Sequence, residues 1–213
     1  MATREQLREQ KRNHIIEAAA VVFARNGYNG TNVADIAREA QVGKGTLYEY
    51  FDSKESLFFA VFEWFFELMT AHTALGLHQI SGTAADRLRA LSENLMGAWE
   101  GMLEIQTLFM EFWAAAGSSP MQEKFKEAFR TGYRTFRTII GDLIREGIQA
   151  GQFRPDINID SITAVMVGAW DCLPLQAWFD PEVNPAVVAR EFVEVVLRGL
   201  AANPSALSNK ETI

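Results

Sequence analysis

Residues 44–50 hold the side chains best suited to hydrogen bonding with a polyanion. The run contains one amine, Lys44, and three hydroxyl groups, and Gly45 and Thr46 near its start are small. Amines and hydroxyls donate hydrogen bonds to phosphate oxygens, and small residues allow a helix to approach base edges closely. The chemistry that this run predicts is therefore the recognition of nucleic acid.

Residues that perform catalysis or hold metals are scarce. The histidines are His14, His72 and His78, and Cys172 is the single cysteine, which suits a reducing compartment. His72 and His78 are six residues apart, whereas two metal ligands on one helix face stand four apart. The sequence also has no glycine-rich phosphate loop and no nucleophile elbow. We therefore expect no enzymatic activity, no metal ion and no cofactor.

The elements that position this run are predicted to be short helices. A first helix is expected over residues 4–26, with Gly27 as its terminator. Thr31 or Asn32 is a suitable N-cap for a second helix, and a third is expected after Gly43. Two short helices separated by a turn are the layout of a helix-turn-helix DNA reader.

A fourth helix is expected to connect this reader to the rest of the chain. Asp52 or Ser53 is predicted to cap it, and Asp52 with Glu55 has the spacing of a capping box. Its apolar residues cover an unusually wide arc, which predicts contact with the reader on one side and with a second core on the other.

The fold class is predicted to be all-α with about nine helices, because apolar residues recur at helical spacing and strand-like alternation is scarce. An N-terminal three-helix helix-turn-helix domain is expected at residues 1–54, a helical bundle at residues 55–204 and a flexible tail at residues 205–213. The expected helices of the bundle that follow the connecting helix cover residues 84–99, 102–116, a long stretch that ends at 151–155, 160–178 and 185–202.

The charge of the chain is unevenly distributed. The formal net charge is −7, which taken alone argues against a nucleic-acid binder. Residues 1–54 hold eight Lys and Arg against seven Asp and Glu, whereas residues 55–213 hold twelve against twenty. The predicted reader is thus weakly basic and the acidity lies outside it. Weak basicity predicts modest nonspecific affinity for DNA with a strong salt dependence.

Residues 13–58 resemble the TetR family of one-component bacterial transcriptional regulators. The residues of the resemblance are Gly27-Tyr28, Gly30-Thr31, Asp35-Ile36-Ala37, Lys44-Gly45-Thr46-Leu47-Tyr48, Tyr50-Phe51 and Ser53-Lys54. Beyond residue 58 the match is limited to the number and length of the helices. The resemblance implies double-stranded operator DNA as a partner, a homodimer, and a bundle that binds an effector.

Seven residues are expected to contact DNA, from their chemistry and the resemblance together. They are Thr31, Lys44, Gly45, Thr46, Tyr48, Tyr50 and Lys54. The lysines are expected to bind phosphates, and the tyrosines to reach phosphates or thymine methyl groups. The hydroxyl of Thr31 is expected to donate from the start of the second helix.

For four further features near this interface the sequence allows more than one role or departs from the family pattern. A basic run predicts either an arm on the adjacent DNA or a solvated helix paired with Glu5 and Glu9. The run consists of Arg4, Arg8, Lys11 and Arg12. Gln41 stands where the family commonly has a turn glycine, so a costly left-handed backbone is expected there. Gly43 replaces a common capping serine, and Glu49 either accepts from cytosine or points away.

All five Trp and thirteen of the fifteen Phe lie beyond residue 55. The resemblance implies an effector pocket among the middle helices, and each lining residue is alternatively plain core. The implied lining is Phe62, Phe66, Met102, Phe109, Trp113 and Trp170. Glu104, Glu111 and Asp171 suit a lipophilic cation if they face the pocket, and are otherwise solvated. An apolar or aromatic effector is the favoured alternative.

The last two expected helices have apolar stripes that predict a dimer interface. The stripes are Ile162, Val165, Met166, Ala169 and Leu173, and Val188, Phe192, Val195, Val196, Gly199 and Leu200. Two copies of this pair form a four-helix bundle. A dimer places two reading helices about one turn of DNA or more apart, which predicts a palindromic site.

These features together predict a ligand-responsive transcriptional regulator. The favoured form is a repressor that binds a palindromic operator as a dimer and is released by a small apolar or aromatic effector. The alternative is an architectural or protein-responsive DNA-binding regulator without a small-molecule effector. The N-terminus lacks the apolar core of a signal peptide, and no uninterrupted apolar run approaches the roughly 18 residues of a membrane span. A cytoplasmic protein without a membrane partner is expected.

Overall fold

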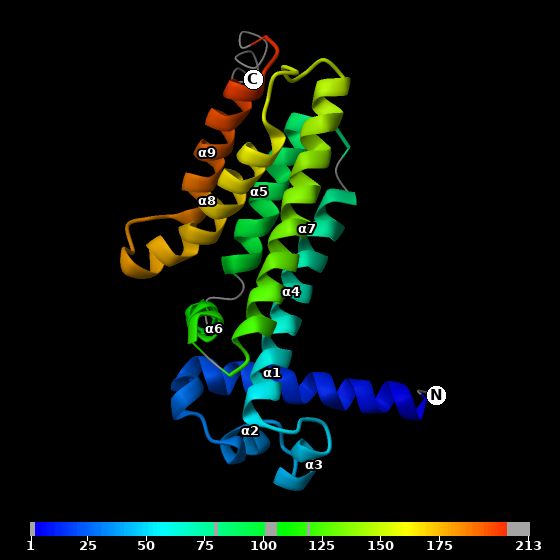
Figure 1. The fold of residues 1–213 in the computed structure, drawn as a ribbon, viewed down its shortest axis with the longest axis vertical. Coiled ribbons are helices and arrows are strands. Elements are labelled where there is room, and N and C mark those ends of the chain that lie inside the picture. Colours follow the sequence, from blue (N-terminus) through cyan, green and yellow to red (C-terminus); the bar gives the residue numbers. More distant parts are fainter. Residues whose placement is uncertain (1–2, 79–80, 101–105, 119, 204–213) are drawn as a thin grey trace. The chain divides into compact units, whose positions relative to one another are not determined.

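The computed structural model describes residues 3–78, 81–100, 106–118 and 120–203, and these ranges hold nine helices and no strand (Figure 1). The all-α class expected from the sequence is confirmed. By compactness the chain forms two units, one of residues 1–68 with 102–129 and one of 69–101 with 130–213. Two helices, α4 (Lys54–His78) and α7 (Gln122–Gln149), contribute to both units. The expected domain boundary at residue 54 stays a prediction.

The first helix, α1 (Arg4–Gly30), is interrupted at Gly27 instead of ending there. Gly27 has a φ of 66° and a ψ of 166°, and the helix resumes through Gly30. This backbone conformation is essentially restricted to glycine. At the other end a capping box forms, because Thr3 and Gln6 each donate a backbone N–H to the other's side chain. The axis of the last turn of α1 therefore differs in direction from the axis of the rest of the helix.

The capping residues decide where the short helices begin. Of the two N-caps expected for α2 (Val33–Glu39), Asn32 is the one used, and its side chain accepts from the N–H of Ala34 at 2.9 Å. Helix α4 begins after Ser53, which exchanges backbone N–H to hydroxyl bonds of 3.1 Å with Ser56. The expected capping box of Asp52 with Glu55 is wrong, because the serine pair has the same spacing one residue further along.

The core of the first unit is a cluster of phenylalanine rings from α4, α6 (Gln106–Ser118) and α7. The ring centre of Phe62 lies 5.1 Å from that of Phe112 and 5.2 Å from that of Phe125. Helix α6 packs on α1, where the hydroxyl of Thr107 donates to the carbonyl oxygen of Ala24 at 3.2 Å. Burial of each ring contributes roughly 1.5–3 kcal/mol, so these rings hold α4, α6 and the start of α7 together.

In the second unit α5 (Ala84–Glu100) packs against α9 (Pro185–Leu200) and α8 (Ile159–Phe179) (Figure 1). Arg89 of α5 donates two hydrogen bonds to the carboxylate of Glu194 in α9. This ion pair raises the pKa of Arg89 and lowers that of Glu194. Helix α8 meets the length and composition of a membrane span, a test that core helices of soluble proteins also meet.

Candidate nucleic-acid interface

The turn between α2 and α3 (Lys44–Tyr48) is built around Gln41, whose φ is 51°. The N–H of Gln41 donates to the carbonyl oxygen of Arg38 at 3.1 Å, and that of Val42 donates to the carbonyl oxygen of Ala37 at 2.9 Å. These two bonds form a Schellman motif, whose left-handed position is usually glycine. The left-handed backbone expected at Gln41 is confirmed.

Helix α3 presents one side to the core and one to solvent. Leu47 is 1% exposed and belongs to the core, whereas Tyr48 is 45% exposed. Lys44 and Gly45 are also exposed, and Thr46 is half-buried. A Cβ added at Gly45 would meet no atom within 4 Å, so the backbone is open on that side. An exposed amine, an open backbone and an exposed phenol on one short helix suit a reading helix.

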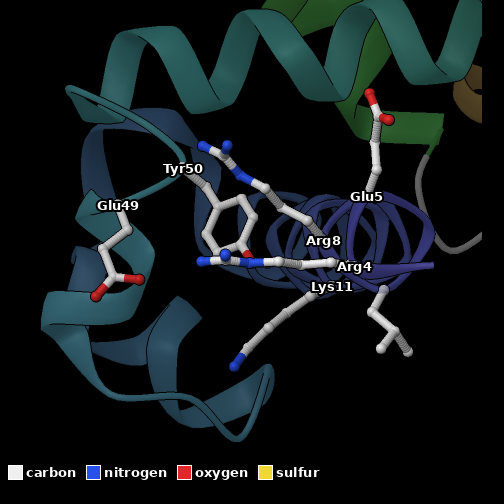
Figure 2. Close-up of a pocket in the computed structure, with 7 residues that line it drawn as sticks. Arg4, Glu5, Arg8, Lys11, Glu49 and Tyr50 are labelled. Carbon is white, nitrogen blue, oxygen red and sulfur yellow. The ribbon is translucent and has the colours of Figure 1, made fainter.

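Basic side chains of α1 line a concave surface beside the residues that follow α3. This basic groove has a volume of about 730 Å³ and is lined by Arg4, Glu5, Leu7, Arg8, Lys11, Glu49 and Tyr50. Figure 2 shows Arg4, Arg8 and Lys11 extending from α1 towards the segment of Tyr50, while Glu5 extends away. The guanidinium carbon of Arg8 lies 5.8 Å from the ring centre of Tyr50.

The charges of the basic groove are available to a partner. Within the described ranges no carboxylate forms an ion pair with Arg4, Arg8 or Lys11. Arg12 differs from them, because it pairs with Glu9 at 3.8 Å. The geometry thus favours a basic arm for the first three residues and a solvated ion pair for Arg12. Sequence reasoning left this choice open, because it depends on which side chains face Tyr50.

Thr31 and Lys54 form hydrogen bonds inside the protein. Thr31 is 4% exposed, and its hydroxyl donates to the carbonyl oxygen of Gly27 at 2.7 Å. The amine of Lys54 donates to the carbonyl oxygens of Tyr28 and Thr31 at 2.9 and 3.2 Å. The ammonium also lies 4.4 Å from the ring centre of Tyr28. Both side chains therefore join the end of α1 to its neighbours, which differs from the phosphate contacts expected of them.

Four of the six expected effector-pocket residues come together in the first unit. These are Phe62, Phe66, Phe109 and Trp113. The ring centre of Phe129 lies 4.9 Å from Phe62 and 5.6 Å from Phe66. The ring of Phe109 lies 6.1 Å from that of Phe129 and 5.2 Å from Trp113. These contacts fit a buried core and a pocket wall equally, so the lining role stays a prediction.

Met102 and Trp170 are the other two residues expected to line the pocket. Met102 is outside the described residues. Trp170 belongs to the second unit, where it is 2% exposed. Its indole N–H has no hydrogen-bond acceptor among the described residues. A buried N–H without a partner is uncommon in a folded protein.

A largely enclosed carboxylate, Asp171, follows Trp170 in α8. It accepts a 2.6 Å hydrogen bond from the hydroxyl of Tyr133 in α7. Burial raises the pKa of Asp171 from 3.8 to about 6, and the bond from Tyr133 opposes part of this rise. The sequence left open whether Asp171 is solvated or internal, and in the structure its carboxylate is internal. In the part of the chain that is described, no group of three or more His, Cys, Asp or Glu is placed to hold a metal ion.

Apolar side chains of α8 and α9 reach the surface. Val165 is 60% exposed, Val195 is 67% exposed and Val188 is 40% exposed. Met166 and Leu200 of the expected dimer stripes are buried, so each stripe is divided between the core and the surface. Exposed apolar groups on neighbouring helices mark an interaction surface.

Two family models match the chain. One, described as bacterial regulatory proteins of the tetR family, matches residues 15–61. The other, described as a tetracyclin repressor-like C-terminal domain, matches residues 81–200 and so covers more than half of the chain.

Relatives and solved structures agree with these matches. The HTH-type transcriptional repressor KstR2 of Mycolicibacterium smegmatis is 27% identical over 195 residues, which are 89% of this chain and 90% of the relative. A transcriptional regulator from Saccharomonospora viridis, solved in complex with choline, has a TM-score of 0.76 at 22% identity and covers 89% of this chain and 96% of its own. FadR from Bacillus subtilis, solved in complex with stearoyl-CoA, has a TM-score of 0.72 at 22% identity, over 88% of this chain and 98% of its own. At these identities the two structures show the fold alone.

Proposed function

Because the chain belongs to the TetR family of bacterial regulatory proteins, we propose that it is a ligand-responsive transcriptional repressor. It binds a palindromic operator as a homodimer in the cytoplasm, and a small apolar or aromatic effector releases it. The observation behind the proposal is the exposed side of α3, with its amine, open backbone and phenol. The relative KstR2 is a transcriptional repressor, which supports repression over activation for this chain.

The DNA contacts of the proposal are divided between two surfaces. Lys44, Gly45, Thr46 and Tyr48 of α3 enter the major groove, where small residues and a phenol suit base edges. Arg4, Arg8, Lys11 and Tyr50 of the basic groove bind the neighbouring phosphates. Thr31 and Lys54 take part as positioning residues, because their polar atoms bond to the backbone around Gly27.

The effector is proposed to bind among the aromatic residues of the middle helices. The proposed lining is Phe62, Phe66, Phe109 and Trp113 of the first unit. An apolar or aromatic ligand fits this chemistry, because aromatic rings make up most of the wall and the wall has few polar groups. Two similar structures, solved in complex with choline and with stearoyl-CoA, support a small molecule as the ligand of such a fold.

Dimerisation is proposed through α8 and α9, whose valines are exposed. Helix α4 belongs to both compact units, so a ligand that displaces it changes the separation of the two reading helices. Operator affinity then falls by the ratio of the ligand's affinities for the two states.

The test is operator binding by fluorescence anisotropy, with an operator selected from random DNA, followed by a screen for ligands that release it. Saturable release by an apolar ligand supports the proposal. The Phe62→Ala and Phe109→Ala double variant is expected to abolish release and to retain operator binding. Met110→Ala, an exposed neighbour on α6, is the matched control. Operator binding that no ligand of any class changes would favour the protein-responsive or architectural alternative.

A further inference from the structure

A second cavity of the first unit lies beside the kinked end of α1. Its volume is about 240 Å³, and its walls come from α1, α4, α6 and the segment that leads into α7. None of the proposed effector residues lines it. The side chains that decide its chemistry are Tyr28, Glu55, Phe58, Glu111 and Phe125.

One side of the cavity is aromatic. The ring centres of Tyr28 and Phe58 are 4.7 Å apart, and those of Phe58 and Phe125 are 5.8 Å apart. The ammonium of Lys54, held by the carbonyl oxygens of Tyr28 and Thr31, lies 4.4 Å from the centre of the Tyr28 ring, so this ring has a cation beside it. Aromatic rings attract organic cations through their electron-rich faces.

The charged groups of the cavity are both carboxylates. Glu55 comes from α4 and Glu111 from α6, and no lysine or arginine lines the cavity. Backbone hydrogen bonding and then the hydroxyl of Tyr28 keep the pKa of Glu55 below its usual range, so this carboxylate stays ionised at neutral pH. Glu111 forms no hydrogen bond or ion pair with the residues that the structure describes. The cavity thus combines two negative charges with apolar walls.

We propose that this cavity binds a small organic ammonium ion. The charged group of the ligand lies with the carboxylates of Glu55 and Glu111, and its apolar part lies against Phe58 and Phe125. A neutral apolar molecule leaves the carboxylate of Glu111 without a counter-charge, whereas Glu55 has the ammonium of Lys54 near it, which helps to lower its pKa. Among the described residues no third His, Cys, Asp or Glu joins these two carboxylates to hold a metal ion. The site is therefore separate from the proposed effector site in both position and ligand class.

The position of Glu111 connects this cavity to the DNA-binding helices. A Cβ added at Gly27 would stand 2.9 Å from Oε1 of Glu111, so the carboxylate rests against the kink of α1. The carbonyl oxygen of Gly27 accepts from Thr31, which directly precedes the cap of α2. A ligand that draws Glu111 into the cavity removes this contact and is expected to change operator affinity. Only this last step rests on the proposed function.

The test compares two probes of the same shape, protonated phenethylamine and neutral 2-phenylethanol, by isothermal titration calorimetry with the full-length chain at pH 7. The cation is expected to bind at one site per chain, at least about tenfold more tightly than the alcohol. Glu111→Gln is expected to remove most of this preference, whereas Glu63→Gln, an exposed carboxylate of α4, is expected to retain it. Equal affinity for the two probes, or an unchanged preference in Glu111→Gln, would overturn the proposal.

A second variant keeps the test informative if Glu111→Gln does not fold. Ala115→Leu adds a side chain at the cavity wall and is expected to weaken binding of the cation without a change of charge. The Phe109→Ala variant, at a residue of the proposed effector site that does not line this cavity, is expected to bind phenethylammonium as the unchanged chain does. Loss of binding in that variant would assign the cation to the effector site and contradict a separate cavity. Calorimetry needs no DNA. The affinity for the cation can therefore be measured and interpreted even if the protein does not bind an operator.

Discussion

The hydroxyl of Tyr133 in α7 donates a 2.6 Å hydrogen bond to the enclosed carboxylate of Asp171 in α8. Burial raises the pKa of Asp171 to about 6, above the value of 3.8 for an exposed carboxyl. Between about pH 4 and pH 6 the folded protein therefore holds a proton that the unfolded chain has released. The free energy of unfolding is expected to fall as the pH rises through this window, by about 3 kcal/mol.

Asp171→Asn removes the titrating group and retains an acceptor for the hydroxyl of Tyr133. We expect urea unfolding at a fixed protein concentration, at pH 4.5 and pH 7, to show a smaller difference in this variant than in the unchanged chain. Asp160→Asn, an exposed carboxyl in the first turn of the same helix, is the control. Equal pH dependence of all three proteins would contradict the enclosed position of Asp171.

Arg8→Ala is expected to weaken operator binding and to reduce its dependence on salt. Each phosphate contact that is lost lowers the slope of log affinity against log salt by about 0.9. The measurement is anisotropy at several salt concentrations. Arg190→Ala, on the exposed surface of α9, is expected to leave the slope unchanged. An unchanged slope in Arg8→Ala would remove the basic groove from the interface.

Lys54→Met and Lys44→Met separate a positioning lysine from a phosphate contact. Lys54→Met removes the amine that donates to the carbonyl oxygens of Tyr28 and Thr31 and is expected to lower the free energy of unfolding by about 1–3 kcal/mol. Lys44→Met, at an exposed position, is expected to change stability by less than about 0.5 kcal/mol and to reduce operator affinity. Urea unfolding and anisotropy check both. Full stability of Lys54→Met together with weak operator binding would restore its phosphate role.

Gln41→Gly is expected to stabilise the protein by about 0.5–1 kcal/mol. The left-handed backbone of a non-glycine residue costs about 1–2 kcal/mol, and the extra freedom of glycine in the unfolded chain offsets part of the gain. Gln10→Gly, at an exposed position inside α1, has no such strain to release and is expected to destabilise by about 1 kcal/mol. Thermal and urea unfolding measure both changes. Destabilisation by Gln41→Gly would mean that the turn holds no strain.

Val195→Glu is expected to separate the dimer into monomers. The side chain is 67% exposed in the single chain, and a charge there opposes burial in an apolar interface. Light scattering after size-exclusion chromatography measures the mass, and operator binding is expected to weaken with it. Met110→Glu, at an exposed position of α6, is the control. A Val195→Glu variant that stays dimeric would contradict a dimer interface at this position.

Features set by neighbouring residues could be predicted from the sequence. The left-handed Gln41 belongs to this class, because it depends on the chemistry of a few adjacent positions. For the cap of α2 the sequence left Thr31 and Asn32 as alternatives, of which Asn32 is used. The choice of Ser53 over Asp52 as a cap could not be predicted, since both residues have a suitable side chain and a partner at the right spacing.

Contacts between distant segments were not predictable from local patterns. The amine of Lys54 bonds to the carbonyl oxygen of Tyr28, which is 26 residues away in the chain. From the sequence alone, His14 is only one of the few residues that could perform catalysis. In the structure its Nε2 lies 3.1 Å from the carbonyl oxygen of Ala40. Glu111 is placed at the kink of α1 by the packing of α6, which no spacing in the sequence encodes.

The kink at Gly27 has a genetic consequence. Every missense change of this codon adds a side chain to a backbone conformation that only glycine adopts readily, and it directs the new Cβ at Glu111. A random-mutation screen for lost repression is therefore expected to recover many alleles at this codon. Such alleles change no residue proposed to touch DNA or ligand, because the strain lies in the backbone at Gly27.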